Sequence, residues 1–156
     1  MVSTSGHRLL AENAVSALTE SIFPIACIIT PNIPEAEILS DMEIKNPDQM
    51  VKSAEIIAEK FGGNVLLKGG HLESTAADLL YADGVKTWFE TKKIDNPNTH
   101  GTGCTLSSAI ASNLGKGMNV KESVKLAKDY VTGAIMDGLD LGRGRGPLNH
   151  MYKNII

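Results

Sequence analysis

Seven consecutive residues, Thr99-His-Gly-Thr-Gly-Cys-Thr105, place glycines, hydroxyl groups and a thiol directly before an apolar segment. Gly101 and Gly103 allow the backbone to turn its N–H groups toward one point. The helix expected from about Cys104 to Asn113 adds the unpaired N–H groups and the positive dipole end of its first turn. Both features favour an anion, and a phosphate in transfer would suit the loop. The alternative is a plain helix-capping loop, because the spacing matches neither common glycine-rich phosphate motif.

The thiol of Cys104 would lie at the start of that helix, where the dipole stabilises a thiolate that can accept a proton. The alternative is a small packing residue, since most free cysteines are buried. Cys27 lies inside an apolar run, and we interpret it only as a packing residue.

A second polar segment, Thr30-Pro-Asn-Ile-Pro-Glu35, follows a short apolar run. Asn32 and Glu35 offer hard oxygen ligands of the kind that Mg²⁺ prefers. The alternative is helix capping, with Asn32 as the N-cap of a helix that Pro34 opens and Glu35 in its first turn.

A third polar segment, Lys68-Gly-Gly-His71, follows the apolar triplet Val65–Leu67. A lysine at a strand end can reach a phosphate as a point charge, and Gly69 and Gly70 would let a nucleotide approach the backbone. The alternative is a lysine that lays its stem along the protein and keeps its charge in solvent.

The periodicity of the chain predicts an α/β fold whose mostly parallel sheet carries an antiparallel hairpin at one edge. Ligands of such sheets gather at the carboxyl ends of the strands, so the three polar segments should meet there. One domain covering residues 1–156 is expected. The expected helices are His7–Ile22, Pro34–Leu39, Asn46–Phe61, Cys104–Asn113 and Val120–Leu139, and the expected strands are Ile25–Ile29, Val65–Leu67, Ala77–Ala82 and Val85–Thr91, the last two joined by Asp83-Gly84.

Composition excludes several classes of protein. The 156 residues carry a formal net charge of -3, which argues against a nucleic-acid-binding surface. No apolar run is long enough for a membrane span, and the first residues lack the apolar core of a signal peptide. We therefore expect a cytoplasmic protein that binds neither membranes nor nucleic acids. The two cysteines and four scattered histidines suggest no disulfide framework and no zinc site.

The ordered motifs TPNxPE, KGGH, DLLYxDG, THGTGCT and GPLNH together resemble one family, the hydroxymethylpyrimidine/phosphomethylpyrimidine kinases of thiamine biosynthesis, which belong to the ribokinase-like superfamily. The resemblance covers essentially the whole chain. It implies a ribokinase-like fold, ATP and Mg²⁺ as cofactors, and a small pyrimidine alcohol as substrate. The implied site residues are Gly101, Thr102 and Gly103 as anion hole, Cys104 as base, Lys68, Gly69, Gly70 and Thr102 for ATP, and Asn32 and Glu35 on the Mg²⁺ side.

The family pattern also has a substantial part before Met1, with much of the pyrimidine pocket and an aspartate linked to the metal. We therefore expect this chain to be the C-terminal, nucleotide- and phosphate-handling portion of the fold, starting at an internal methionine. Alone it should lack kinase activity. The strand edge at Ile25–Ile29 should then be uncovered and pair with another chain, so we expect a homo-oligomer, a dimer.

Two other functions remain open on the sequence. A pyridoxal or pyridoxine kinase can carry the same GTGC loop, and the residues that would discriminate the substrate lie mostly before Met1. A noncatalytic nucleotide-binding fragment that works beside a partner chain is the third hypothesis.

Overall fold

The computed structural model describes residues 11–69, 76–91, 94, 96, 100–141, 143–144 and 146–153. The chain divides into two compact units, Met1–Thr91 and Lys92–Ile156, which are described one at a time. The expectation of a single domain over residues 1–156 stays a prediction.

The first unit begins with a helical segment that changes type along its length. Helix α1 (Glu12–Ala17) continues as the π-helix η1 (Leu18–Ile22) and ends in the 3-10 turn η2 (Phe23–Ile25). The longer helix ends at Ile22, as the sequence predicted, and Pro24, which has no N–H to donate, follows inside the 3-10 turn. The part of the predicted helix from residue 7 to residue 10 lies outside the described residues.

The four strands of the first unit form one sheet in the order β1 (Ile28–Ile29), β2 (Asn64–Leu67), β3 (Ala76–Ala82) and β4 (Val85–Thr91). β1 runs parallel to β2, whereas β3 and β4 add antiparallel pairs. Asp83 and Gly84 both have positive φ, 51° and 76°, as a two-residue type I′ turn requires. The predicted α/β class and the antiparallel hairpin at the edge are confirmed. The sheet of the described residues is mixed rather than mostly parallel, because only the β1–β2 pair is parallel.

The strand predicted at Ile25–Ile29 is shorter than expected. Only Ile28 and Ile29 pair with β2, and Ile25 is 80% exposed at the end of the 3-10 turn. The expected burial of Cys27 is wrong as well, because this residue is exposed at a bend. The side chain of Asn64 donates to the Cys27 carbonyl at 2.9 Å, which holds the residue before β1 against the start of β2.

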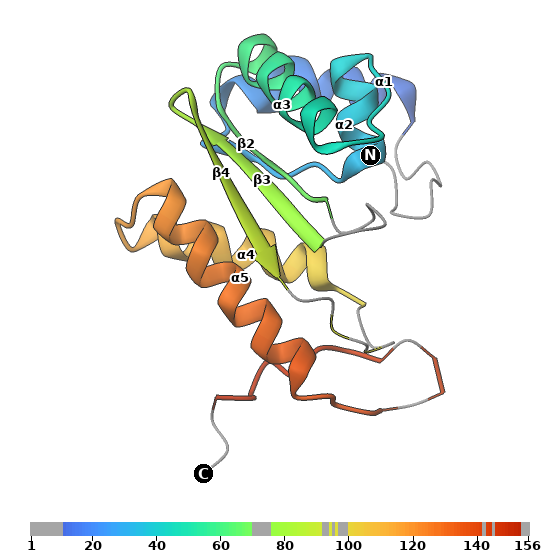
Figure 1. Cartoon of the computed structure of the whole chain (residues 1–156), viewed down its shortest axis with the longest axis vertical. Coiled ribbons are helices and arrows are strands. Elements are labelled where there is room, and N and C mark those ends of the chain that lie inside the picture. Colours follow the sequence, from blue (N-terminus) through green and yellow to red (C-terminus); the bar gives the residue numbers. More distant parts are fainter. Residues whose placement is uncertain are drawn as a thin grey trace. The chain divides into compact units, whose positions relative to one another are not determined.

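Helices α2 (Ile33–Ser40) and α3 (Pro47–Phe61) lie on one face of the sheet (Figure 1). The Asn46 side chain accepts from the Gln49 N–H at 2.9 Å at the start of α3, and Gly62 ends the helix at φ 71°. Both signals were predicted from the sequence. The core between α3 and the sheet contains Met50, Ala54, Ile57, Val65, Leu67 and Leu79.

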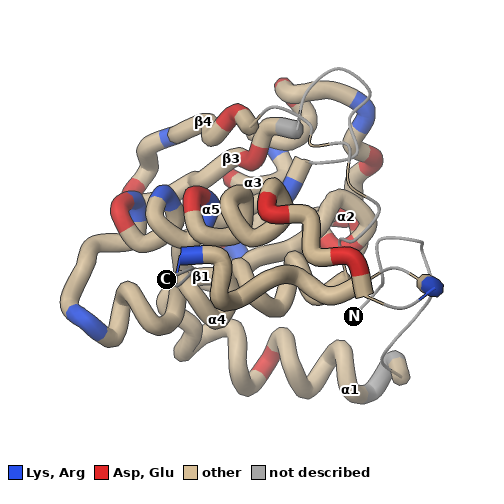
Figure 2. Tube along the Cα trace, turned by 90° about the horizontal axis from the view of Figure 1, so that it is seen from below, with Lys and Arg blue, Asp and Glu red and all other residues tan. Residues whose placement is uncertain are grey.

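The second unit is built on α4 (Thr102–Gly115) and α5 (Val120–Met136), which pack against each other. Both predicted helices are present. α4 starts two residues earlier than expected, and α5 ends before the left-handed Gly138, at φ 68°. Lysines and acidic residues are interspersed along both α3 and α5 (Figure 2).

The segment after α5 folds back and contacts the C-terminal half of that helix. The Tyr130 hydroxyl donates to the His150 carbonyl at 3.2 Å, and the Asn149 side chain donates to Asp137 at 2.6 Å. The ring of Tyr152 covers Gly133 so closely that a Cβ there would lie 2.3 Å from it. Within the described residues, no helix is both long and apolar enough to cross a membrane.

Candidate phosphate and nucleotide site

Asn32 and Glu35 form a capping box at the N-terminus of α2. The Asn32 side chain accepts from the Glu35 N–H at 2.9 Å, and Glu35 Oε2 accepts from the Asn32 N–H at 3.1 Å. The capping alternative that the sequence offered is therefore present. The box also fixes two oxygen-bearing side chains in one turn, where hard ligands for Mg²⁺ would be needed.

Lys68 lies beside Asn32, although the two residues are 36 positions apart in the sequence. The two residues form an isolated parallel bridge just past the ends of β1 and β2, and the Lys68 N–H donates to the Pro31 carbonyl at 2.9 Å. Two of the three predicted polar segments thus meet at one sheet edge. Parallel pairing causes this, because it brings the carboxyl ends of both strands together.

The residue after Lys68 is held by a side chain that sequence reasoning did not assign. The Gly69 N–H donates to Oδ1 of Asp78 on β3 at 3.0 Å, and Asp78 is a buried residue, 8% exposed. An ionised acceptor makes such a hydrogen bond stronger than a neutral one. The available signal was an acidic residue inside the otherwise apolar strand Ala76–Ala82, where a buried carboxylate needs a partner.

Gly69 itself is required by packing. A Cβ at this position would lie 2.1 Å from the Ala77 carbonyl oxygen and 2.8 Å from Cε of Met50. The backbone therefore lies directly against β3 and α3 with no space for a side chain. Gly70, the other glycine predicted to contact ATP, lies outside the described residues.

In the second unit, Gly101 caps α4 with φ 84°, in the left-handed region that favours glycine. No side chain of the cap residue occupies the helix start. Gly103 and Cys104 lie in the first turn, and both are exposed. The Ser107 hydroxyl donates to the Cys104 carbonyl at 3.0 Å, which tightens this turn. The predicted glycine loop before a helix is confirmed, and the burial alternative for Cys104 is wrong.

The chain returns to this loop near its C-terminal end. His100, the residue before the glycine cap, forms an isolated parallel bridge with Pro147. Leu148, which follows Pro147, is buried, at 4% exposure. The motif GPLNH therefore supports the start of the loop.

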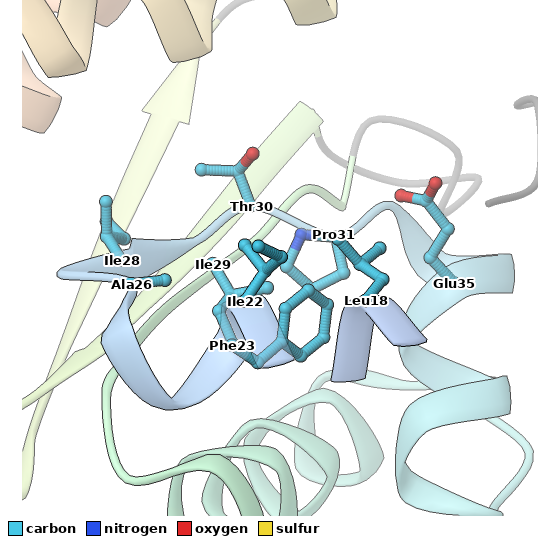
Figure 3. Close-up of a pocket in the computed structure, with 9 residues that line it drawn as sticks. All are labelled: Leu18, Ile22, Phe23, Ala26, Ile28, Ile29, Thr30, Pro31 and Glu35. Carbon is cyan, nitrogen blue, oxygen red and sulfur yellow. The ribbon is translucent and has the colours of Figure 1, made fainter. Parts of the chain in front are cut away.

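A shallow cavity of about 290 Å³ lies in the first unit, beside β1 (Figure 3). Its lining is apolar apart from Thr30 and Glu35. The carboxylate of Glu35, predicted on the Mg²⁺ side, therefore borders an apolar pocket beside β1.

The structure brings together Asn32, Glu35, Lys68 and Gly69 within the first unit, and Gly101, Thr102, Gly103 and Cys104 within the second. Whether the two groups share one triphosphate stays a prediction.

These features define a class: an α/β protein with a lysine and a metal-type oxygen pair at parallel strand ends, and a glycine-capped helix carrying a thiol. The Phosphomethylpyrimidine kinase family matches residues 1–149, and the chain belongs to that family. Its fold is ribokinase-like, as predicted.

Individual relatives agree with this assignment. A hydroxymethylpyrimidine/phosphomethylpyrimidine kinase of Haemophilus influenzae is 39% identical over 155 residues, covering 96% of this chain and 58% of that protein. A Bacillus subtilis pyridoxal kinase structure with ADP has a TM-score of 0.85 at 37% identity, covering 96% of this chain and 57% of its own. A phosphomethylpyrimidine kinase structure from Clostridium difficile has a TM-score of 0.75 at 41% identity, covering 86% and 54%. The chain thus spans a little more than half the length of these relatives.

Proposed function

We propose that this chain is part of an ATP-dependent kinase that phosphorylates 4-amino-5-hydroxymethyl-2-methylpyrimidine or its monophosphate. The observation that carries the proposal is the bridge between Asn32 and Lys68. It places a side chain that could bind a metal beside a lysine that could bind phosphate, at the ends of the strands. Family membership supplies the reaction class. A cytoplasmic location, where ATP is available, belongs to the same proposal.

The proposed chemistry needs positioned phosphates more than covalent catalysis. Cys104 acts as the base and accepts the proton of the substrate hydroxymethyl group. The resulting oxygen attacks the γ-phosphorus, the bond to the β-phosphate oxygen breaks, and ADP leaves. Backbone N–H groups of Gly101–Gly103 stabilise the charge on the transferring phosphoryl group, and Lys68 neutralises the phosphates.

Mg²⁺ would lie on the Asn32 and Glu35 side, where it neutralises phosphate charge. The donor set fits a hard cation, because both side chains offer oxygen. No cluster of three His, Cys, Asp or Glu residues that could hold a metal occurs in the described part of the chain. Water and phosphate oxygens would therefore supply most ligands, as is common for Mg²⁺.

The test is turnover of ATP with the pyrimidine alcohol. It compares Cys104→Ala with Cys27→Ala in a protein that has the full length of the family members. Both cysteines are exposed, so the pair is matched for accessibility and for the loss of a thiol. Cys104→Ala should lower kcat roughly 10²-fold or more, the range for losing a general base, while ATP binding persists. Cys27→Ala should leave kcat unchanged. A near-normal kcat for Cys104→Ala would show that this thiol is not the base.

A pyridoxal kinase is the second candidate, favoured by the likeness to the Bacillus subtilis pyridoxal kinase. The ratio of kcat/KM for the pyrimidine alcohol to that for pyridoxal separates the two. A ratio above one supports the first proposal. Binding of ADP without turnover of either alcohol would favour a noncatalytic nucleotide-binding fragment.

We also propose that the chain as printed forms a homodimer through the edge of β1. This strand pairs only with β2 among the described strands, and Ile25 beside it is 80% exposed. Such edges tend to pair with another chain. Light scattering should give a mass above 16.6 kDa for the printed chain, and Ile25→Lys should reduce it toward the monomer. A monomer at every concentration tested would contradict this proposal.

A further inference from the structure

Asp78 continues a row of polar side chains across three strands of the first unit. β2 and β3 pair Leu66 with Leu80 and Leu67 with Leu79, so the same register sets Asp78 opposite Lys68. The bridge on the other side sets Asn32 beside Lys68. Paired residues of neighbouring strands project to the same face. Asn32, Lys68 and Asp78 therefore share one face at the strand ends, opposite the face that α3 covers.

The carboxylate of Asp78 is hydrogen-bonded to the backbone directly after Lys68. Asp78 is buried, at 8% exposure, and its carboxylate accepts from the Gly69 N–H at 3.0 Å. On the opposite face Gly69 lies against Met50 and the Ala77 carbonyl. The chain directly after Lys68 is thus held from both faces, by a carboxylate on one and by close packing on the other.

We propose that Asp78 is a positioning residue for nucleotide binding: it fixes the Lys68–Gly69 backbone so that the lysine meets the phosphates. The proposal rests on the proposed kinase function. A phosphate-binding lysine on a long flexible stem is effective only when its backbone is fixed, because affinity falls as binding groups lose their geometry. The interaction is with the backbone amide, so Asp78 need not touch the nucleotide.

The experiment measures Mg·ADP binding to the printed chain by calorimetry, for wild type, Asp78→Ala and Asp78→Asn. Alanine removes the acceptor and should raise the Kd roughly 10-fold. Asparagine keeps an acceptor oxygen of the same shape without the charge, so its Kd should lie between the other two. The matched control is Ser53→Ala, which removes another buried hydrogen bond of the first unit, to Ser40 at 2.8 Å, away from the loop.

Ser53→Ala should lower the thermal midpoint without changing the Kd by more than about twofold, since its hydrogen bond joins α2 to α3 only. Equal Kd values for wild type and Asp78→Ala would overturn the positioning role. So would a Kd for Ser53→Ala as high as that of Asp78→Ala, since the effect would then follow from lost stability. If alanine prevents folding, an Asp78→Asn protein with the wild-type Kd overturns the proposal. A wild-type chain that binds no Mg·ADP would overturn this inference, whereas the kinase proposal is tested separately, by turnover in the full-length context.

Discussion

Gly69→Ala tests the close packing behind Lys68. The added Cβ would lie 2.1 Å from a backbone oxygen, Ala77 O, which no rotamer change can move. Relief requires β2 and β3 to separate by about 1 Å, since ordinary contacts of this kind exceed 3 Å. The nearby Met50 methyl, at 2.8 Å, cannot yield easily either, because this side chain is fully buried.

The expected cost combines two effects. Overpacking a filled site costs about 1–3 kcal/mol. Separating the strands also breaks the hydrogen bond from the Gly69 N–H to the Asp78 carboxylate, worth about 1.5–3 kcal/mol. The free energy of unfolding should therefore fall by about 3–5 kcal/mol, a large share of the roughly 5–15 kcal/mol typical of a native domain.

Urea unfolding followed by the fluorescence of Trp88 is the suitable assay, because the only tryptophan of the chain lies on β4 of the same unit. Gly115→Ala is the matched control. It adds the same methyl group at a helical position with nothing within 4 Å, so it should stabilise α4 by about 0.5–1 kcal/mol, as measured by circular dichroism. A Gly69→Ala protein within 1 kcal/mol of wild type would refute the steric reasoning.

Four substitutions test different kinds of stabilising interaction. Ser123 is fully buried, and its hydroxyl has no hydrogen-bond partner among the residues that the structure describes, so Ser123→Ala should be neutral or stabilising in urea unfolding. Ser53→Ala should instead cost about 1–2 kcal/mol, and the reverse order would contradict the role of the Ser53 hydrogen bond. Gly133→Ala should displace the ring of Tyr152, which is movable, and speed proteolysis after α5 with less than about 2 kcal/mol lost; unchanged cleavage would mean that the ring does not hold this segment. Asn46→Ala should cost about 1 kcal/mol of unfolding free energy by removing the α3 cap, and no loss would mean that Pro47 alone starts the helix.

The sequence predicted helix ends and turns well where they depend on a few adjacent residues. Asn46 followed by proline starts α3, Gly62 ends it, and Asp83-Gly84 makes the hairpin turn, because each depends on the conformational preference of a few adjacent residues. The same reasoning located Lys68 at a strand end and the glycine cap before Cys104.

Features that depend on distant partners were not predictable in this way. Ile25 is as apolar as Ile29, yet only Ile29 is buried and paired, because the partner strand sets where β1 begins. The role of Asp78 is also invisible locally, since its partner Gly69 approaches only when β3 folds back along β2. Asn32 shows a third limit, because one oxygen can cap a helix and still suit a metal, and the sequence does not rank these uses.

The bridge between His100 and Pro147 has a consequence for synthesis of the protein. A ribosome releases the loop that precedes α4 well before it has made the segment that lies beside His100. During that interval His100 has no Pro147 to pair with, and Tyr130 on α5 has no His150 to contact. The glycine loop before α4 is therefore among the last parts to be completed. A premature stop shortly before Pro147 would spare every helix and strand described above and still leave that loop unfinished.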